Sequence, residues 1–385
     1  MNRGADVIVV GSGIIGASCA HYLAKAGFKV HVIEAQASIC AGTSKACDGF
    51  VSVWDKLDEA SFELAHMSAQ MWAELSEELT VKFDYRRCGH LLITGTEVGV
   101  NQLGDICKRT RLAGEPAELL DETKLRSLIP QLSHSVTNGL LLPNEAQVDP
   151  RKATVALLNE AKMSGAKISV SMPVIGFLMS GGRIRGVKTA DGEIGCELVV
   201  VATGVWTSEL IERGVGIKLP IVPRKGHVLV LERSSFTIPH LLAEVGYIGS
   251  LVSADGLQVA FVLEQTVDGT ILVGSSRELG KGDSTVELNV VTAIAQRAIS
   301  VMPPLRNLLL IRTYAGLRPW TPDMMPIIGK IDGLDGMLIA AGHEGGGICM
   351  APATGQLITK IVLGEELPSF AKAFSPTRFL KGQRS

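Results

Sequence analysis

The sequence predicts an α/β fold in which a buried parallel sheet is joined to a second, mixed sheet. The first sheet is predicted by two apolar runs, DVIVV at residues 6–10 and KVHVIE at residues 29–34, with a helical pattern over residues 14–26 between them. Continuous apolar strands are typical of parallel sheets covered on both faces, and strand, helix and strand in this order build such a unit. The strand-rich stretch over residues 217–275 predicts the second sheet.

Composition narrows the class of protein. Forty-two glycines among 385 residues are more than the average of roughly 7% would give, so many backbone positions must turn tightly or lie against something. The net charge of −2, with Lys and Arg scattered along the chain, disfavours nucleic-acid binding. The seven cysteines form no C-x-x-C pair, which argues against a zinc site or a disulfide framework and favours a reducing cytoplasm.

The N-terminal run VIVVGSGIIGASCA is open to two interpretations. It has the apolar character of a secretory signal, but Gly11, Gly13 and Gly16 would weaken a signal helix. We therefore expect a buried strand that turns into a helix, and a cytoplasmic protein. No stretch reaches about 18 uninterrupted apolar residues, so no membrane span is expected.

The first turn carries a nucleotide-binding pattern, G-x-G-x-x-G. Gly11 permits the tight turn, Gly13 lets the backbone approach a pyrophosphate, and Gly16 lets helix and strand pack closely. Phosphates would lie at the helix N-terminus, where free N–H groups favour anions. Glu34 ends the second strand, where its carboxylate can accept both ribose hydroxyls, while the following Ala35 supplies no cation for a 2′-phosphate. The full turn comprises Gly11, Ser12, Gly13, Ile14, Ile15 and Gly16.

Two later apolar strands also end in glycine, LVVVATG at residues 198–204 and MLIAAG at residues 337–342. The carboxyl ends of parallel strands meet at the ligand crevice, so Gly204 and Gly342 are expected to approach the same dinucleotide. An NAD domain has no evident need for the signature near the C-terminus, which is better explained as closure over a longer FAD.

The order of elements predicts two interleaved domains. We expect a Rossmann-type FAD-binding domain of the glutathione-reductase kind and an α+β substrate domain built on a mixed β-sheet. The first would comprise residues 1–82, 143–216 and 308–370, the second residues 83–142 and 217–307, with a C-terminal tail at 371–385.

At these residues the chain resembles the D-amino-acid-oxidase-like family of FAD-dependent amine oxidases and dehydrogenases, including glycine and sarcosine oxidases. Within it, the chain is most similar to the β subunits of bacterial opine oxidases and D-hydroxyproline dehydrogenases. The matching segments are GSGIIG with Glu34, AGTSKACDGFVS (41–52), VVVATGVWT (199–207), PRKGHVLVLE (223–232), GTILVGSSRE (269–278), YAGLRPWTPDMMPIIG (314–329) and AAGHEGGGICMAPATG (340–355).

The resemblance implies further contacts to FAD. Backbone at Val174 would touch the adenine, and the glycine loop near residue 345 would offer N–H groups to the flavin, although such a loop is also typical of a structural turn. Trp206 could instead be a core residue that does not contact FAD. The implied set is Gly42, Thr43, Ser44, Gly49, Ala202, Thr203, Gly204, Trp206, Gly342, Glu344, Gly345, Gly346, Gly347 and Ile348.

Three residues are candidates for contact with substrate. Arg318 could clamp a substrate carboxylate, a role that the resemblance also implies, with a structural ion pair as the alternative. His343 and Tyr247 are further candidates, each with a packing role as the alternative. Sarcosine-oxidase-like enzymes attach the flavin to a cysteine at a position occupied here by Gly316, so we expect FAD to be bound non-covalently.

The predicted reaction is oxidation of the C–N bond of an amino acid or opine-like secondary amine bearing a carboxylate, by hydride transfer to the flavin. The resemblance implies a catalytic β subunit in a hetero-oligomer whose partner subunits accept electrons. Additional flavin or iron–sulfur centres in the partners, and peripheral membrane association through them, are options that the resemblance leaves open. Three alternatives stay open: a stand-alone glycine or D-amino-acid oxidase that makes hydrogen peroxide, a hydrogen-cyanide-synthase-like subunit, and a non-catalytic flavoprotein subunit.

Overall fold

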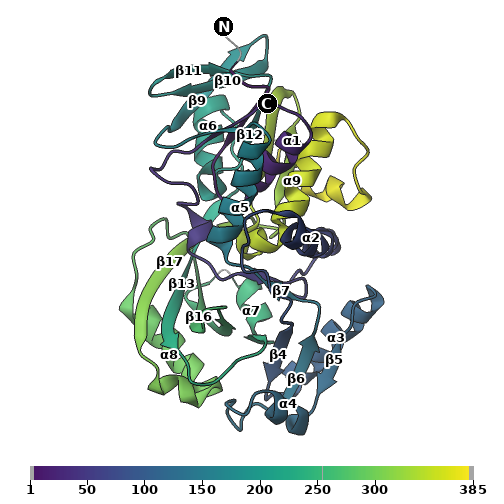
Figure 1. The fold of residues 1–385 in the computed structure, drawn as a ribbon, viewed down its shortest axis with the longest axis vertical. Helices are drawn as coiled ribbons and strands as arrows, with labels where there is room; N and C mark the ends of the chain where they lie inside the picture. Colours follow the sequence, from purple (N-terminus) through teal and green to yellow (C-terminus); the bar gives the residue numbers. More distant parts are fainter. Residues whose placement is uncertain (1–3, 254, 381–385) are drawn as a thin grey trace.

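The computed structural model describes residues 4–253 and 255–380. These residues form two halves that are stacked along the long axis of the molecule (Figure 1), each built on its own sheet. One sheet has nine strands and the other eight, and a two-stranded ribbon pairs β3 (Phe50–Val51) with β7 (Ala146–Gln147). The predicted combination of an α/β half with a mixed-sheet half is confirmed.

The nine-stranded sheet is parallel at its centre. Its strands run in the order β8 (Lys167–Ser169), β2 (Val30–Ile33), β1 (Val7–Val10), β12 (Leu198–Val201) and β19 (Leu334–Ala341). Every residue of β1 and β2 is buried, as their continuous apolar sequences predict. Beyond these, β18 (Ile327–Ile331) pairs with β19 in antiparallel fashion, and β10 (Arg183–Thr189) pairs with β19, β9 (Val174–Ser180) and β11 (Gly192–Gly195).

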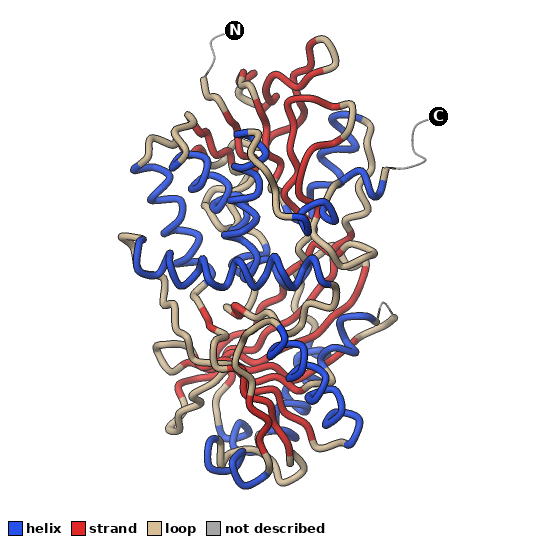
Figure 2. Tube along the Cα trace, turned by 90° about the vertical axis from the view of Figure 1, so that its right-hand side faces the viewer, coloured by secondary structure: helices blue, strands red, loops and turns tan. Residues whose placement is uncertain are grey.

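Helices cover both faces of this sheet, and Figure 2 shows a layer of them to one side of its strands. This layer contains α1 (Ile14–Lys25), α2 (Glu59–Glu78), α5 (Pro150–Met163) and α9 (Gly347–Leu363), while α6 (Thr207–Val215) packs on the other face. Helices α1 and α9 cross closely at Gly355, where a Cβ would lie less than 3.0 Å from Ser18. The segment Glu344–Leu363 is long and apolar enough to cross a membrane, but 61% of its apolar window is buried, as in a core helix.

The eight-stranded sheet forms the other half. Its order is β17 (Leu310–Trp320), β13 (Val222–Arg233), β16 (Thr270–Leu279), β15 (Gln258–Gln265), β14 (Leu241–Glu244), β4 (His90–Thr94), β6 (Asn138–Leu142) and β5 (Glu118–Leu120). Helices α3 (Glu97–Leu112), α4 (Glu122–Leu128), α7 (Tyr247–Val252) and α8 (Leu288–Val301) accompany it.

Strand β17 differs from the predicted division of the chain. The sequence groups residues 308–370 with the first domain, yet β17 pairs with β13 from Leu310 to Trp320 and therefore lies in the eight-stranded sheet. A strand that ends one sheet and leads directly into the next has no local sign of which sheet it joins. This pairing brings Arg318 beside Arg224 of β13 and carries both toward the junction of the two halves.

Candidate functional site

A cavity of about 580 Å³ lies at the carboxyl ends of β1, β12 and β19, where these strands meet the second half; we call it the main cavity. Most of the predicted site residues line it. They are Gly11, Ser12, Gly13, Ile14, Ile15, Glu34, Ala35, Gly42, Thr43, Ser44, Val174, Ala202, Thr203, Gly204, Trp206, Tyr247, Arg318, His343, Glu344, Gly345, Gly347 and Ile348. Trp206 is 50% exposed, so its alternative interpretation as a core residue is wrong.

Four predicted glycines do not line the main cavity. A Cβ on Gly16 would lie less than 3.0 Å from the Gly11 carbonyl, which is the helix packing that the sequence predicts for this position. Gly49 packs against the Val148 carbonyl, and a Cβ on Gly342 would lie 2.9 Å from Thr321. Gly346 lines a smaller neighbouring cavity. Close packing of backbone and close approach to a ligand both require glycine, so the sequence alone does not distinguish them.

Glu34 is fixed at one end of the main cavity. Its Oε2 accepts hydrogen bonds from the backbone N–H of Ser12 at 2.9 Å and from the Ser12 hydroxyl at 2.6 Å, and its Oε1 accepts one from Gln36 N. Each carboxylate oxygen retains further acceptor capacity, as contacts to ribose hydroxyls would require. The glycine turn and the acid that the sequence pairs in function are therefore physically joined.

Two helices begin at the main cavity. Helix α1 has Gly13 as its N-cap and α9 has Gly346, and neither carries an acidic residue in its first turn. At the start of α1, the Ser44 Oγ accepts a hydrogen bond from Ile14 N at 3.0 Å. Free N–H groups and the helix dipole make both ends favourable places for negative charge.

Arg318 reaches the main cavity from β17 beside the loop at Gly345. Its Nη1 donates to the Ser276 carbonyl at 3.0 Å, and among the described residues no carboxylate lies within 4.0 Å of its guanidinium. A Cβ on Gly345 would lie 3.7 Å from Arg318 Nε. A structural ion pair, the alternative role for this arginine, is therefore not found in the described chain.

Two further arginines were not predicted. Arg277 and Arg224 are each only 1% exposed and lie 3.6 Å and 3.5 Å from Glu344 Oε1. Burial acts to raise the pKa of Glu344, but the guanidinium groups of Arg277, Arg318 and Arg224 hold that pKa below its ordinary value. Charged residues inside otherwise apolar strands, PRKGHVLVLE and GTILVGSSRE, were the available signal.

Tyr247 and His343 differ in how they face the site. The Tyr247 hydroxyl accepts from Arg277 Nη2, and the Arg277 guanidinium lies 4.3 Å from the centre of the tyrosine ring. His343 is 3% exposed and its Nε2 is 3.0 Å from Thr354 Oγ1 on α9, and burial lowers its pKa to about 3. The imidazole is therefore neutral and bonded to the helix, which favours its packing role.

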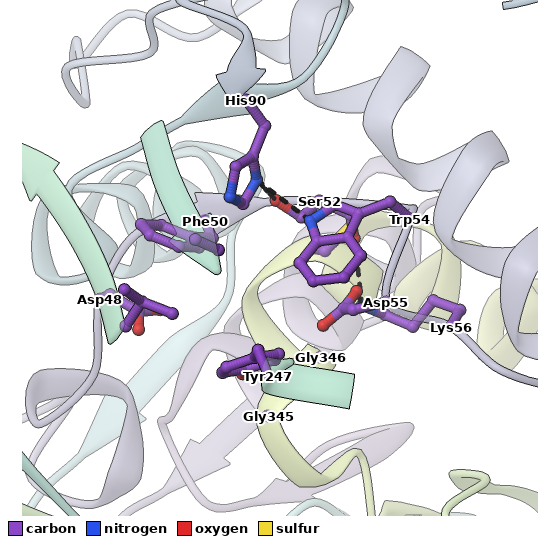
Figure 3. Close-up of a pocket in the computed structure, with 13 residues that line it drawn as sticks. Asp48, Phe50, Ser52, Trp54, Asp55, Lys56, His90, Tyr247, Gly345 and Gly346 are labelled. Atoms are coloured by element: carbon purple, nitrogen blue, oxygen red, sulfur yellow. Dashed lines mark hydrogen bonds and ion pairs between the residues drawn. The ribbon is translucent and has the colours of Figure 1, made fainter. Parts of the chain in front are cut away.

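The small cavity, shown in Figure 3, adjoins the main one and shares Asp48, Tyr247 and Gly345 with it. Asp48 and Phe50 lie on one side of it, and the ion pair of Asp55 and Lys56 lies on the other. Its volume of about 20 Å³ is enough for roughly one water molecule. His90 also lines it, with Nδ1 held by Ser52 at 3.0 Å, Trp54 at 3.2 Å and Glu145 at 3.1 Å.

The fold and the main cavity place the chain in the class of dinucleotide-binding oxidoreductases. The model of the family described as "DAO: FAD dependent oxidoreductase" matches residues 6–361, and the chain belongs to this family. It is an enzyme of that family, and FAD is its cofactor.

Individual relatives match the chain over nearly its whole length. The chain is 30% identical to the hydrogen cyanide synthase subunit HcnC of Pseudomonas protegens, covering 97% of this chain and 96% of the relative. It is 28% identical to a glycine oxidase of Pseudomonas putida, covering 94% and 95%. The crystal structure of L-proline dehydrogenase from P. horikoshii superposes with a TM-score of 0.90 at 29% identity, covering 99% of each chain.

The main cavity fits FAD by its own chemistry. Glu34 offers carboxylate oxygens at one end, the start of α1 offers N–H groups in the middle, and the start of α9 offers them beside Arg318 at the other end. This order matches the parts of FAD: the carboxylate can accept from a ribose, and the two sets of N–H groups can donate to a pyrophosphate and to the electron-rich edge of a flavin ring.

Proposed function

We propose that the chain oxidises the C–N bond of an amino acid or an opine-like secondary amine. The observation that carries this proposal is Arg318: its guanidinium is anchored through Nη1 and has no carboxylate within 4.0 Å in the described chain. A guanidinium that is held in place and has no carboxylate partner can donate two parallel hydrogen bonds to a substrate carboxylate. The names of the relatives, which include glycine oxidase and L-proline dehydrogenase, support an amine or amino-acid substrate.

Bound FAD would supply the acceptor for the hydride that leaves the substrate carbon next to nitrogen. Arg318 would hold the carboxylate and thereby orient this carbon, and Tyr247 would border the substrate on the side of the small cavity. The hydride passes to this acceptor and the amine proton to solvent water, which leaves an imine that water then hydrolyses. The positioning of substrate against cofactor would contribute most of the rate, so the proposal requires no dedicated general base.

The experiment is an anaerobic screen of the purified, FAD-loaded protein against opines, hydroxyproline isomers, D-amino acids, sarcosine and glycine. We expect the flavin absorbance to bleach with at least one carboxylate-bearing amine. If a full panel leaves the absorbance unchanged while dithionite bleaches it, the protein is a non-catalytic flavoprotein subunit and the proposal is wrong.

We also propose that the chain passes its electrons to a partner subunit. The similarity to HcnC, which is described as a subunit, supports this proposal. Stopped-flow mixing of the reduced protein with air-saturated buffer tests it, since slow reoxidation is expected of a subunit that needs its partner. Fast peroxide formation would instead identify a stand-alone oxidase. Cytoplasmic location and peripheral membrane association through partners remain predictions.

A further inference from the structure

The charged groups around Arg318 leave one cation and one anion without a close partner of opposite charge. Arg224 donates to the carbonyls of Ser250, Leu251 and Ser253, and it shares Glu344 with Arg277. Glu344 is therefore the shared counter-ion of these two buried arginines and offsets one of their two positive charges.

Asp48 is the remaining anion at this end of the main cavity. It lines both the main cavity and the small cavity, and in the described residues no cation lies within 4.0 Å of its carboxylate. Of the cations that lower the pKa of Asp48, Arg318 has the largest effect. In the described residues Arg318 itself has no carboxylate within 4.0 Å. A ligand with separated negative and positive charges would complete both groups.

The backbone on either side of Asp48 is held in place. The Tyr314 hydroxyl donates to the Cys47 carbonyl at 3.2 Å, and Gly49 N donates to the buried Glu264 Oε2 at 3.1 Å. Gly49 also packs against the Val148 carbonyl too closely to admit a Cβ. These contacts anchor the residues before and after Asp48, so its side chain is presented to the cavity from a fixed backbone.

Burial raises the pKa of Asp48, and the charges of Arg318 and Arg277 counteract this only in part. A half-buried carboxylate in this state is costly to ionise in the absence of a cation, and a bound cation would remove that cost. The same carboxylate would repel a second anion placed on Arg318. The site thus favours a zwitterion over a simple carboxylate.

We propose that Asp48 binds the substrate ammonium while Arg318 binds its carboxylate, so that the pair selects zwitterionic amines. This inference rests on the proposed function, and it assigns a specificity-determining residue to that site. Figure 3 shows Asp48 on the side of Phe50, whereas Asp55 and Lys56, which form an ion pair with each other, lie on the opposite side of the small cavity.

The test uses isosteric pairs of ligands that differ in the amine alone. Glycine is paired with propionate and proline with cyclopentanecarboxylate, and calorimetry on the dithionite-reduced, FAD-loaded protein prevents turnover during binding. The variants are Asp48→Asn, which keeps the shape, and Asp48→Glu, which keeps the charge. Asp191→Asn, in the exposed turn between β10 and β11, is the matched control for loss of one carboxylate.

We expect Asp48→Asn to weaken binding of glycine or proline by about tenfold or more, the usual effect of removing one partner of a desolvated charge pair. Propionate and cyclopentanecarboxylate should bind as before or more tightly, and Asp48→Glu should keep a preference for the amines. Equal effects on both members of a pair, or none, would overturn the role of Asp48. A wild-type protein that binds none of the four ligands, and whose flavin no amine of the anaerobic screen bleaches, would instead overturn the proposed function and the inference with it.

If Asp48→Asn loses FAD or unfolds, the same calorimetric titrations of Asp48→Glu test the role of Asp48. Retention of a tighter affinity for glycine than for propionate supports the charge pairing. Equal affinities for the two ligands contradict it.

Discussion

The Arg318 side chain of β17 lies over Gly226 of β13, whose register partner is Gly316, and a Cβ on Gly226 would lie less than 3.0 Å from Arg318 Nη1. The same nitrogen donates to the Ser276 carbonyl of β16. The absence of a side chain at position 226 therefore creates the space that the proposed carboxylate-binding guanidinium occupies.

Gly226→Ala should impair substrate binding with little loss of FAD. The added methyl must displace the guanidinium, and a misplacement of about 1 Å can cost up to about 100-fold in rate. Steady-state kinetics with the amine identified in the screen should show a raised KM for carboxylate-bearing substrates. Gly282→Ala, where a Cβ meets open space, is the control and should leave KM unchanged. An unaltered KM in Gly226→Ala would refute this account of the strand.

Gly16→Ala should weaken FAD binding. A Cβ at this position would press on the Gly11 carbonyl, so α1 must move away from the turn, and overpacking of this kind costs about 1–3 kcal/mol. Flavin retained after gel filtration measures the effect. Gly176→Ala on β9, where a Cβ meets nothing within 4 Å, should retain FAD like the wild type. Equal retention by both variants would argue against the packing role of Gly16.

The flavin should be released intact on acid precipitation. A Cβ at Gly316, the position of the attachment cysteine in sarcosine-oxidase-like enzymes, would lie 2.6 Å from the Ala46 carbonyl. Cys47 lines the main cavity, but its Sγ donates to the Ser44 carbonyl at 3.3 Å and burial raises its pKa well above the ordinary value, so a reactive thiolate is disfavoured. All the yellow colour should appear in the supernatant, and colour in the pellet would show covalent attachment.

Glu264 should make the protein less stable as pH rises. Burial, reinforced by Asp48, raises its pKa to about 8 from an ordinary value of 4.5. Between these two values the folded protein binds more protons than the unfolded chain, so the free energy of unfolding falls as pH increases across that window. One pKa unit corresponds to about 1.4 kcal/mol, which sets the loss at a few kcal/mol.

Glu264→Gln keeps an oxygen that can accept from Gly49 N and cannot ionise. Thermal unfolding of the FAD-loaded variant should therefore show a smaller decline between pH 5 and pH 8 than the wild type, a range within the window that the raised pKa of Glu264 sets. Parallel pH profiles for the two proteins would mean that Glu264 is ionised in the folded protein at neutral pH.

Local patterns predicted the residues at the Glu34 end of the main cavity and missed two of the arginines at the Arg318 end. The turn from Gly11 to Gly16 and its acid, Glu34, belong to one strand, helix and strand, so their spacing carries the information. Arg224 and Arg277 come from strands of the second sheet, and which way their side chains face depends on register across β13, β16 and β17. Asp48 lies in the segment AGTSKACDGFVS, whose sequence does not show whether this side chain faces solvent, core or a cavity, and only the folded chain shows the two cavities that it lines.

The central claim is that Arg318 recognises a substrate carboxylate beside the flavin. Its most direct test is an anaerobic absorbance titration of the FAD-loaded wild type and Arg318→Gln with glycine against methylamine and with proline against pyrrolidine. Loss of a charge-assisted bidentate contact costs about 1.5–3 kcal/mol, or roughly 10–150-fold in affinity. We expect the wild type to prefer the carboxylate-bearing member of at least one pair by about this factor, and Arg318→Gln to lose the preference. A preference of the same size in both proteins would contradict the account.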